Sequence, residues 1–329
     1  MHSPVRSSLR RDLSILVVSM LALASLPFMA GDFTLSMVLS CLMYIALATS
    51  WGVFCGSTGY LSLASAAFFG IGAYTSAFVL DAVPWLVAIG LGALAAVVLA
   101  IIMGSAVLHL RGTYFAVLTF GMTELIRHTV TLAEKSLAGT VGRVLIDVPE
   151  PDTVYFTMLA IAVAAVLTTI IVRRSRLGLA MAGIGGDEQR AETLGVNTRR
   201  VKVIGFTLTA VFAGAAGAAM SVRWTYIDPT TVFNPFIGFQ TVLIALIGGA
   251  ATLWGPVAAA IVFSVLAETL RLQLPQVYMM TLGLLLILSV LYMPDGLASV
   301  AGKLFRRKHP LPKAAPEAIQ ATVLERGRP

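Results

Sequence analysis

The adjacent acids Asp187 and Glu188 mark the polar segment of this sequence that is best suited to contact another protein. They lie within residues 173–202, the longest polar stretch between two apolar runs. Acidic side chains are favoured at the positive end of a helix, and glycine is favoured just beyond its last turn. The pair therefore predicts a short helix that ends near Gly195 and could dock a soluble partner. An ordinary solvated loop is the alternative.

The predicted docking element combines charges with glycines. Gly183, Gly185 and Gly186 would permit a sharp entry of the chain before the acids. The candidate contact residues are Gly185, Gly186, Asp187, Glu188, Arg190, Glu192 and Gly195.

Glu124 is the acidic residue that the apolar runs place deepest in a hydrophobic segment. A carboxylate near the centre of a bilayer costs about 2.5–3.5 kcal/mol on insertion scales, so it requires a partner. Arg127 and His128 stand one helical turn further on, where they can pair with it. A local ion pair is the simpler interpretation, since a proton relay would need a second buried acid.

Motifs for nucleotide, metal or disulfide chemistry are missing from the sequence. It contains no G-x-x-x-x-G-K-[ST] phosphate loop, so we expect the chain itself neither to bind nor to hydrolyse ATP. Its four histidines are scattered without metal-ligand spacing, and Cys41 and Cys55 both fall in apolar stretches. A membrane-embedded enzyme would need paired acids, a metal cluster or an activated nucleophile, and none is present in the sequence.

The composition places these residues in a membrane protein. Hydrophobic residues make up 58% of the 329 residues and charged residues only 12%, and the mean hydropathy is +0.89. Soluble domains carry about a quarter charged residues, and several apolar runs here reach the roughly 20 residues that a spanning helix needs. The sequence predicts an all-α polytopic fold with about ten, and at least eight, transmembrane helices. The expected segments are 13–30, 34–54, 60–80, 85–108, 113–133, 153–172, 203–222, 236–251, 255–272 and 276–293.

The distribution of positive charge predicts the orientation. Most of the 23 Lys and Arg residues fall in the N-terminal tail, in residues 173–202 and in the C-terminal tail. Cytoplasmic segments carry such an excess, so both termini are expected in the cytoplasm. The net charge of +7 therefore does not indicate a nucleic-acid partner. The predicted organisation is a tail at 1–12, a transmembrane domain at 13–293 and a basic tail at 294–329.

Two predicted spans look like interrupted helices. One runs from Gly56 to Tyr74 and the other from Gly238 to Gly255-Pro256. Glycine and proline allow a membrane helix to break where it lines a water-filled path, and breaks at matching positions indicate a transport path. Close helix packing is the alternative. The candidate path residues are Ser62, Ser65, Phe68, Phe69, Gly72, Tyr74, Gly248 and Gly249.

An ordered set of motifs over residues 35–300 resembles the branched-chain amino-acid ABC transporter permeases of the LivM type. The motifs are Ser62-Leu63 to Tyr74, Leu110-Arg111-Gly112-Thr113-Tyr114-Phe115-Ala116, Asp187-Glu188 to Asn197, Phe212-Ala213-Gly214-Ala215-Ala216-Gly217, Gly248-Gly249 to Gly255-Pro256, and Pro294-Asp295-Gly296-Leu297. The resemblance implies a permease subunit of an importer in the bacterial cytoplasmic membrane. It implies a second, LivH-like permease, two ATPase subunits that use ATP and Mg, and an extracytoplasmic solute-binding protein. It also places the ATPase contact on Asp187-Glu188.

Three departures from the family pattern leave the substrate open. Tyr60 and Ala64 stand where the family usually has Gln and Gly, and Gly185-Gly186 precede Asp187-Glu188 where it has Arg-Asp. The outer loop at 139–143 is degraded. Branched-chain amino acids are the expected substrate, with urea, short amides or other small carboxylates as alternatives. A self-sufficient secondary carrier is the rival class, but it would need buried acids beyond Glu124.

Overall fold

The computed structural model describes residues 4–28, 31–110, 112–145, 148–224 and 226–274, with a few more between 277 and 288. Most of the predicted span 276–293, the tail 294–329 and the motif at 294–297 lie outside the described residues.

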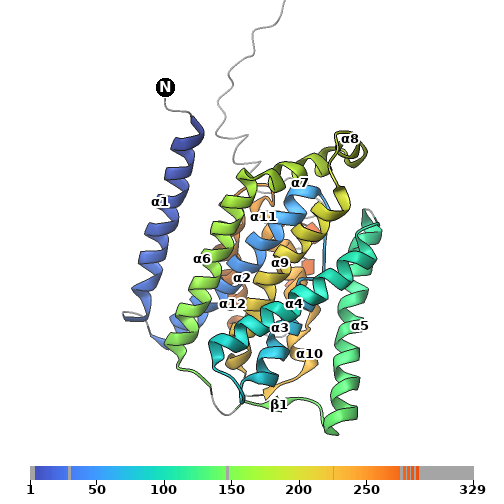
Figure 1. Cartoon of the computed structure of the whole chain (residues 1–329). Coiled ribbons are helices and arrows are strands. Elements are labelled where there is room, and N and C mark those ends of the chain that lie inside the picture. The colour runs from blue at the N-terminus through green and yellow to red at the C-terminus, as the bar shows by residue number, and fades with distance from the viewer. Residues whose placement is uncertain are drawn as a thin grey trace, which may run out of the picture.

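Helices account for nearly all of the described chain (Figure 1). In order they are α1 (Pro4–Ala24), the 3₁₀ helix η1 (Leu26–Phe28), α2 (Asp32–Thr58), α3 (Ser65–Val79), α4 (Trp85–Val107), α5 (Thr113–Ala138), α6 (Pro151–Arg174), α7 (Arg176–Gly186), α8 (Glu188–Thr193), α9 (Thr198–Met220), the 3₁₀ helix η2 (Ser221–Arg223), α10 (Pro229–Val232), α11 (Pro235–Gly248) and α12 (Gly255–Gln273). The short strands β1 (Arg143–Val144) and β2 (Tyr226–Ile227) pair antiparallel, with Arg143 opposite Ile227. The all-α polytopic fold is therefore as predicted.

Six helical segments of the described chain are long and apolar enough to cross a membrane. They contain α2, α4, α6, α9, α11 and α12. The apolar α3 is only 15 residues long, and α5 carries Glu124 and Arg127 within its length. The expected eight to ten spans therefore remain a prediction.

The chain between α2 and α3 differs from the predicted helix at 60–80. Gly59, with φ of +73°, ends α2, and the next helix begins only at Ser65. Trp51 Nε1 donates to the Ser62 carbonyl at 2.8 Å, and Ala64 N donates to Ser62 Oγ at 3.2 Å. These bonds satisfy backbone groups of the non-helical segment 59–64, as a break inside a membrane protein requires.

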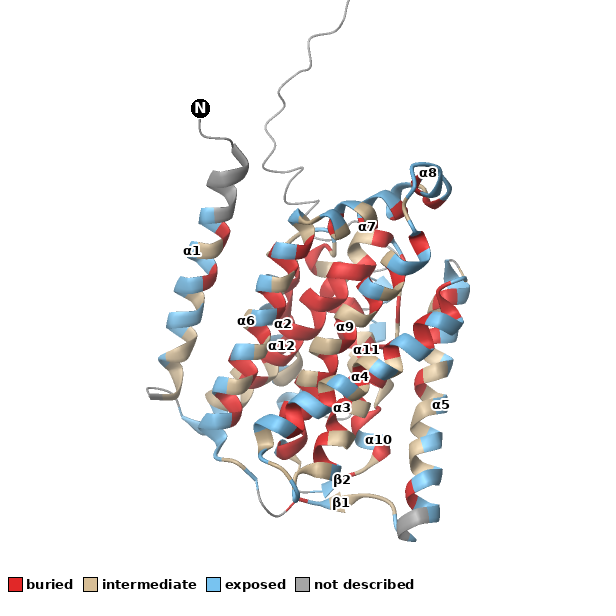
Figure 2. Ribbon diagram, viewed as in Figure 1, coloured by how far each residue is buried: buried red, intermediate tan, exposed pale blue. Residues whose placement is uncertain are grey.

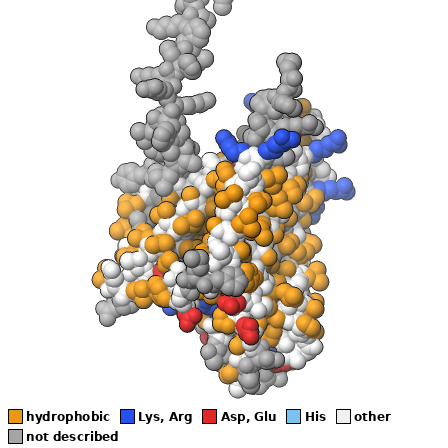
Figure 3. Space-filling model, turned by 90° about the vertical axis from the view of Figure 1, so that its left-hand side faces the viewer, with side chains coloured by type: hydrophobic (Ala, Val, Ile, Leu, Met, Phe, Trp, Pro, Cys, Tyr) orange, Lys and Arg blue, Asp and Glu red, His pale blue; other side chains and the backbone are white. Residues whose placement is uncertain are grey.

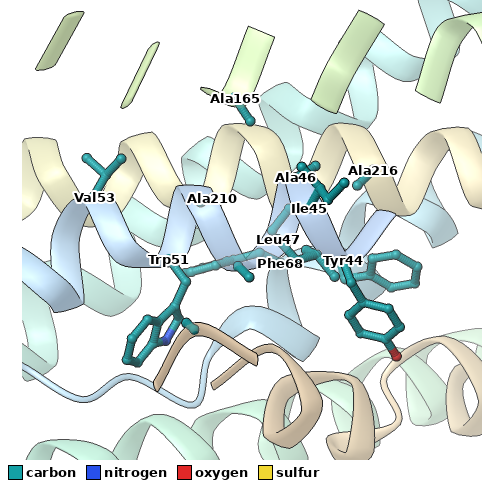
Figure 4. Close-up of a cluster of buried hydrophobic side chains, with 14 of the residues drawn as sticks. Tyr44, Ile45, Ala46, Leu47, Trp51, Val53, Phe68, Ala165, Ala210 and Ala216 are labelled. Atoms are coloured by element: carbon teal, nitrogen blue, oxygen red, sulfur yellow. The ribbon is translucent and has the colours of Figure 1, made fainter. Parts of the chain in front are cut away.

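Helix α2 forms the centre of the bundle (Figure 2). It packs against α6, α7, α9, α11 and α12, and most of its residues are buried. Figure 4 shows Leu47 and Ala46 of this helix among Phe68, Ala165 and Ala210, which come from α3, α6 and α9. Small residues on the outer helices let them approach α2 closely.

Helices α3, α4 and α9 contact one another through glycines. A Cβ atom added at Gly72 would overlap the backbone of Gly214, and one added at Gly217 would overlap the carbonyl of Phe69. Gly214 is in turn pressed against Ala96 of α4. This packing brings three helix backbones into direct contact.

Charged side chains divide the molecule into two ends (Figure 3). Lys and Arg gather beside α7 and α8, and we call this the basic end. Acidic side chains lie toward the end with β1 and β2, which we call the opposite end. Hydrophobic side chains cover the surface between them (Figure 3). An apolar belt between polar ends is typical of a protein that spans a bilayer.

Candidate functional site

Asp187 begins a short helix at the basic end, as predicted. Its backbone is extended, with φ of −163°, and its Oδ1 accepts hydrogen bonds from Gln189 N at 3.0 Å and Arg190 N at 3.2 Å. The helix α8 ends at Thr193, and Gly195 follows in the left-handed conformation with φ of +85°. Residues 173–202 therefore hold two helices, α7 and α8, at an angle set by Asp187.

The glycines before Asp187 do not form the sharp entry that the sequence suggests. Gly183, Gly185 and Gly186 all lie within α7, which stays helical to Gly186. A Cβ at Gly185 would overlap the carbonyl of Ser57, so this glycine allows α7 to rest on the end of α2.

Glu188 points into the protein rather than toward a docking partner, which corrects the prediction that it belongs to the contact surface. Its Oε1 lies 2.6 Å from Lys202 Nζ, and its Oε2 accepts from the Tyr60 hydroxyl at 2.7 Å. Both charged side chains are less than a tenth exposed. Ion pairs this deep persist only when further hydrogen bonds compensate their desolvation.

Lys202 completes a network that joins four parts of the chain. Its Nζ also donates to the Leu108 carbonyl at 2.8 Å and lies 3.2 Å from the Tyr60 hydroxyl. The network thus connects α8, α9, the end of α4 and the non-helical segment before α3. Sequence reasoning counted Lys202 as one more loop cation, although its place directly before the apolar segment 203–222 was a signal that it needed a partner.

The outer face of α7 and α8 combines charge with exposed apolar surface. Arg190 pairs with Asp187 at 3.0 Å, and the Arg190 side chain is 86% exposed. Leu179 is 76% exposed and Leu194 is 84% exposed. Glu192 is held by Thr198 Oγ1, which donates to it at 2.7 Å. This face has the composition expected of a protein contact.

Arg173 binds the turn between α11 and α12 at the same end. Its guanidinium donates to the carbonyls of Ala250, Ala251 and Thr252 at 3.1, 2.8 and 2.8 Å. Gly249, with φ of +83°, shapes this turn, and Gly248 packs directly on Gly255. Gly248 and Gly249 therefore lie in a packed turn joined to α6, where the path role predicted for them remains untested.

A cavity of about 390 Å³ opens in the half of the molecule nearer the opposite end. Tyr44 and Gln240 are buried residues in its lining, and the Tyr44 hydroxyl donates to Gln240 Oε1. Figure 4 shows the Tyr44 ring projecting from α2 on the side away from Ala165 and Ala216. Arg223, Glu268 and Arg271 are charged members of the lining, and the two arginines are exposed.

The predicted path residues do not share one surface. Phe69 lines the cavity, whereas Phe68 is buried against Phe206 with their ring centroids 5.2 Å apart. Gly72 faces Gly214 inside the helix contact described above. Ser62 and Ser65 hold the start of α3, and Tyr74 packs in a second apolar cluster near β2. Sequence reasoning missed Tyr44 and Gln240, although a glutamine within the apolar segment 236–251 was a usable signal.

The acid predicted deepest in the apolar runs has the expected local partner. Glu124 Oε2 lies 2.5 Å from Arg127 Nη2, and both side chains are about a quarter exposed. The two side chains thus form the local pair that their spacing allows, and a role of Glu124 in proton transfer remains untested.

The opposite end is organised by two acids. Glu134 is buried, accepts from Gly142 N at 3.0 Å and lies 3.6 Å from Arg143 Nε. Burial acts to raise the pKa of Asp228, but hydrogen bonds from Thr231 and Thr230 outweigh it, so the pKa lies below its ordinary value. Asp228 thereby stays ionised as the cap of α10.

Known proteins similar to this chain are transport permeases. Residues 33–290 match the family described as branched-chain amino acid transport system / permease component. The chain is 27% identical to the high-affinity branched-chain amino acid transport system permease protein LivM of Escherichia coli, over 88% of this chain and 76% of that protein. The LivM protein of Salmonella typhimurium is 26% identical over the same shares.

A shorter match connects the chain with a second kind of permease. The high-affinity branched-chain amino acid transport system permease protein LivH of Salmonella typhimurium is 30% identical over 139 residues, 41% of this chain and 43% of that protein. No solved structure matches the chain.

Proposed function

This chain belongs to the family of branched-chain amino acid transport permease components, and on this premise we propose that it forms, with a second permease resembling LivH, the path by which an ABC importer moves branched-chain amino acids. The match over residues 33–290 is the observation that carries this proposal. Membership of this family argues against the self-sufficient secondary carrier. Importers of urea, short amides or other small carboxylates remain the alternative within the same family.

The proposed partners are two ATPase subunits, which would use ATP and Mg, and an extracytoplasmic binding protein. The outer face of α7 and α8 supports an ATPase contact, because Leu179 and Arg190 on these helices and Leu194 just after α8 are exposed there. Positive charge at this end supports a cytoplasmic position, with both termini on that side of the bacterial inner membrane.

Coupling requires that a movement of the ATPases reach the membrane helices. The buried pair of Glu188 and Lys202 supports a direct route, because it ties the first turn of α8 to α9. Tyr60 extends the same network to the segment that enters α3. A displacement of α8 would therefore act on α9 and on the break before α3 together.

Reconstitution of the assembled importer tests the proposed function. The chain would be co-expressed with its second permease and ATPases, purified, and placed in liposomes with the binding protein outside. We expect leucine uptake that requires ATP inside, and co-purification of the ATPases with this chain. Uptake that persists without ATP, or a chain that purifies alone and still transports, would contradict the proposal.

A further inference from the structure

The cavity beside Tyr44 and Gln240 has the chemistry of a binding site for a zwitterionic amino acid with an apolar side chain. We propose that it is a transit site at which the importer holds its substrate inside the membrane. This proposal rests on the proposed function and adds to it the residues that recognise the substrate.

The buried amide of Gln240 supplies the first contact. The Tyr44 hydroxyl donates to Gln240 Oε1, which fixes the amide so that its Nε2 group is left to donate. Within the described part of the chain no group accepts a hydrogen bond from Nε2, and Gln240 lines the cavity. The Nε2 group therefore faces the cavity as a donor that a substrate carboxylate can bind in place of water.

Charges at the cavity fit the two ends of a zwitterion. Arg223 and Arg271 lie in its lining. They are among the few basic residues outside the two tails and residues 173–202. Either guanidinium can draw in a carboxylate, and Glu268, 3.7 Å from Arg271, can attract an ammonium group. The lining thus offers a charged partner for each end of a zwitterion.

One part of the wall is apolar. Met43, Phe69, Met220 and Ile237 line the cavity, and a volume of about 390 Å³ is enough for one small amino acid. The apolar side chains can hold the alkyl part of the substrate, while the polar and charged lining residues face its zwitterionic end. A transit site must also release its ligand, so we expect a Kd of about 1 mM rather than tight binding.

Protection from a thiol reagent tests the site without relying on transport. Ile237→Cys would be placed in the assembled importer, with the buried Cys41 and Cys55 replaced by alanine. A small charged methanethiosulfonate is added from outside, and the rate of labelling is measured with and without leucine. We expect 10 mM leucine to slow labelling about tenfold for a Kd of about 1 mM. Ser40→Cys is a second reporter position, and failure of both to label would overturn the proposal.

Two variants and one analogue make the result specific. Gln240→Leu should weaken leucine protection at least about tenfold in Kd, because a hydrogen bond to a charged group is lost. Thr241→Val should keep full protection, since Thr241 bonds the Ile237 carbonyl and does not line the cavity. 3-Methylbutan-1-ol, which has a branched alkyl chain without the zwitterion, should not protect. Equal protection by this alcohol would show an apolar pocket only and overturn the proposal.

Uptake measured in the same liposomes separates this inference from the proposed function. ATP-driven leucine uptake without protection would overturn the transit site and leave the importer standing. Protection without ATP-driven uptake would support the site and contradict the importer.

Discussion

Lys202 Nζ lies 2.6 Å from Glu188 Oε1, so the first residue of the short helix α8 is bonded to the N-terminal part of α9 in a buried environment. In the proposed coupling, the surface residues of α8 would contact the ATPase while this pair links α8 to the membrane helices. The two functions fall on neighbouring residues, Asp187 facing out and Glu188 facing in.

Removal of one member of the pair should destabilise the protein strongly. Glu188→Gln or Lys202→Met leaves the other charge buried, and such changes cost about 3–5 kcal/mol. The double variant Glu188→Gln with Lys202→Met should recover part of that loss, because no lone charge remains. Thermal unfolding of the purified permease pair measures this effect. If the loss of stability in the double variant equals the sum of the losses in the two single variants, the two side chains do not interact directly.

The docking surface predicts a different phenotype for residues that point outward. Arg190→Glu with Leu194→Ser should leave stability within about 0.5 kcal/mol, because both side chains are exposed. The same variant should weaken ATPase association about tenfold or uncouple hydrolysis from uptake. Binding of the ATPases to the permease pair in liposomes measures the association. Arg200→Glu, exposed at the same end but off α8, is the matched control. Wild-type association in the α8 variant would mean that these helices are only a solvated linker.

The double variant Asp187→Lys with Glu188→Lys would reverse both charges at the start of α8, but it would be a poor test of docking. Glu188→Lys would set a second cation against the buried Lys202, so the variant would probe folding as well as partner contact.

Sequence reasoning found the helix at Asp187 because capping is local chemistry. The acids, the glycine and their spacing determine where α8 starts and ends, without reference to other parts of the chain. The partner of Glu188 could not be found this way, since Lys202 and Tyr60 meet it only after α2, α4 and α9 have packed. For the same reason the sequence pointed to Gly72, which packs on Gly214, and not to Gln240, which faces a cavity. Only the packed structure distinguishes a contact between helices from a cavity wall.

Glycines at the contact of α3 and α9 should tolerate no side chain. Gly72→Ala and Gly217→Ala place a Cβ against backbone atoms, and overpacking of this kind costs about 1–3 kcal/mol. Gly90→Ala is the control, because no heavy atom lies within 4 Å of the added Cβ. Unfolding temperatures and the yield of assembled permease pair measure the difference. If Gly72→Ala assembles normally but stops uptake, Gly72 lines a path after all.

Arg173 should hold the turn between α11 and α12 in place. Arg173→Gln removes donors from the carbonyls of Ala250, Ala251 and Thr252, and a typical hydrogen bond contributes about 0.5–1.5 kcal/mol net. We expect faster thiol labelling of Ala250→Cys in this background, because Ala250 is half-buried and the turn opens more often. Arg176→Gln, an exposed arginine in the same segment, is the control. Unchanged labelling in both backgrounds would show that the turn is stable without the guanidinium.

The orientation of the bundle can be tested with two exposed cysteines. Leu145 is 7% exposed and would react poorly, so Val144, which is 62% exposed on β1, is the better outer position. Arg190 is the inner position, at the basic end. A membrane-impermeant thiol reagent should label Val144→Cys in intact cells and Arg190→Cys only in inverted vesicles, because cytoplasmic segments carry the excess of Lys and Arg. The native Cys41 and Cys55 are buried and should give little background. Labelling of both positions from the same side would contradict the division of the molecule into basic and opposite ends across a bilayer, whereas an exchange of the two results would invert the proposed orientation.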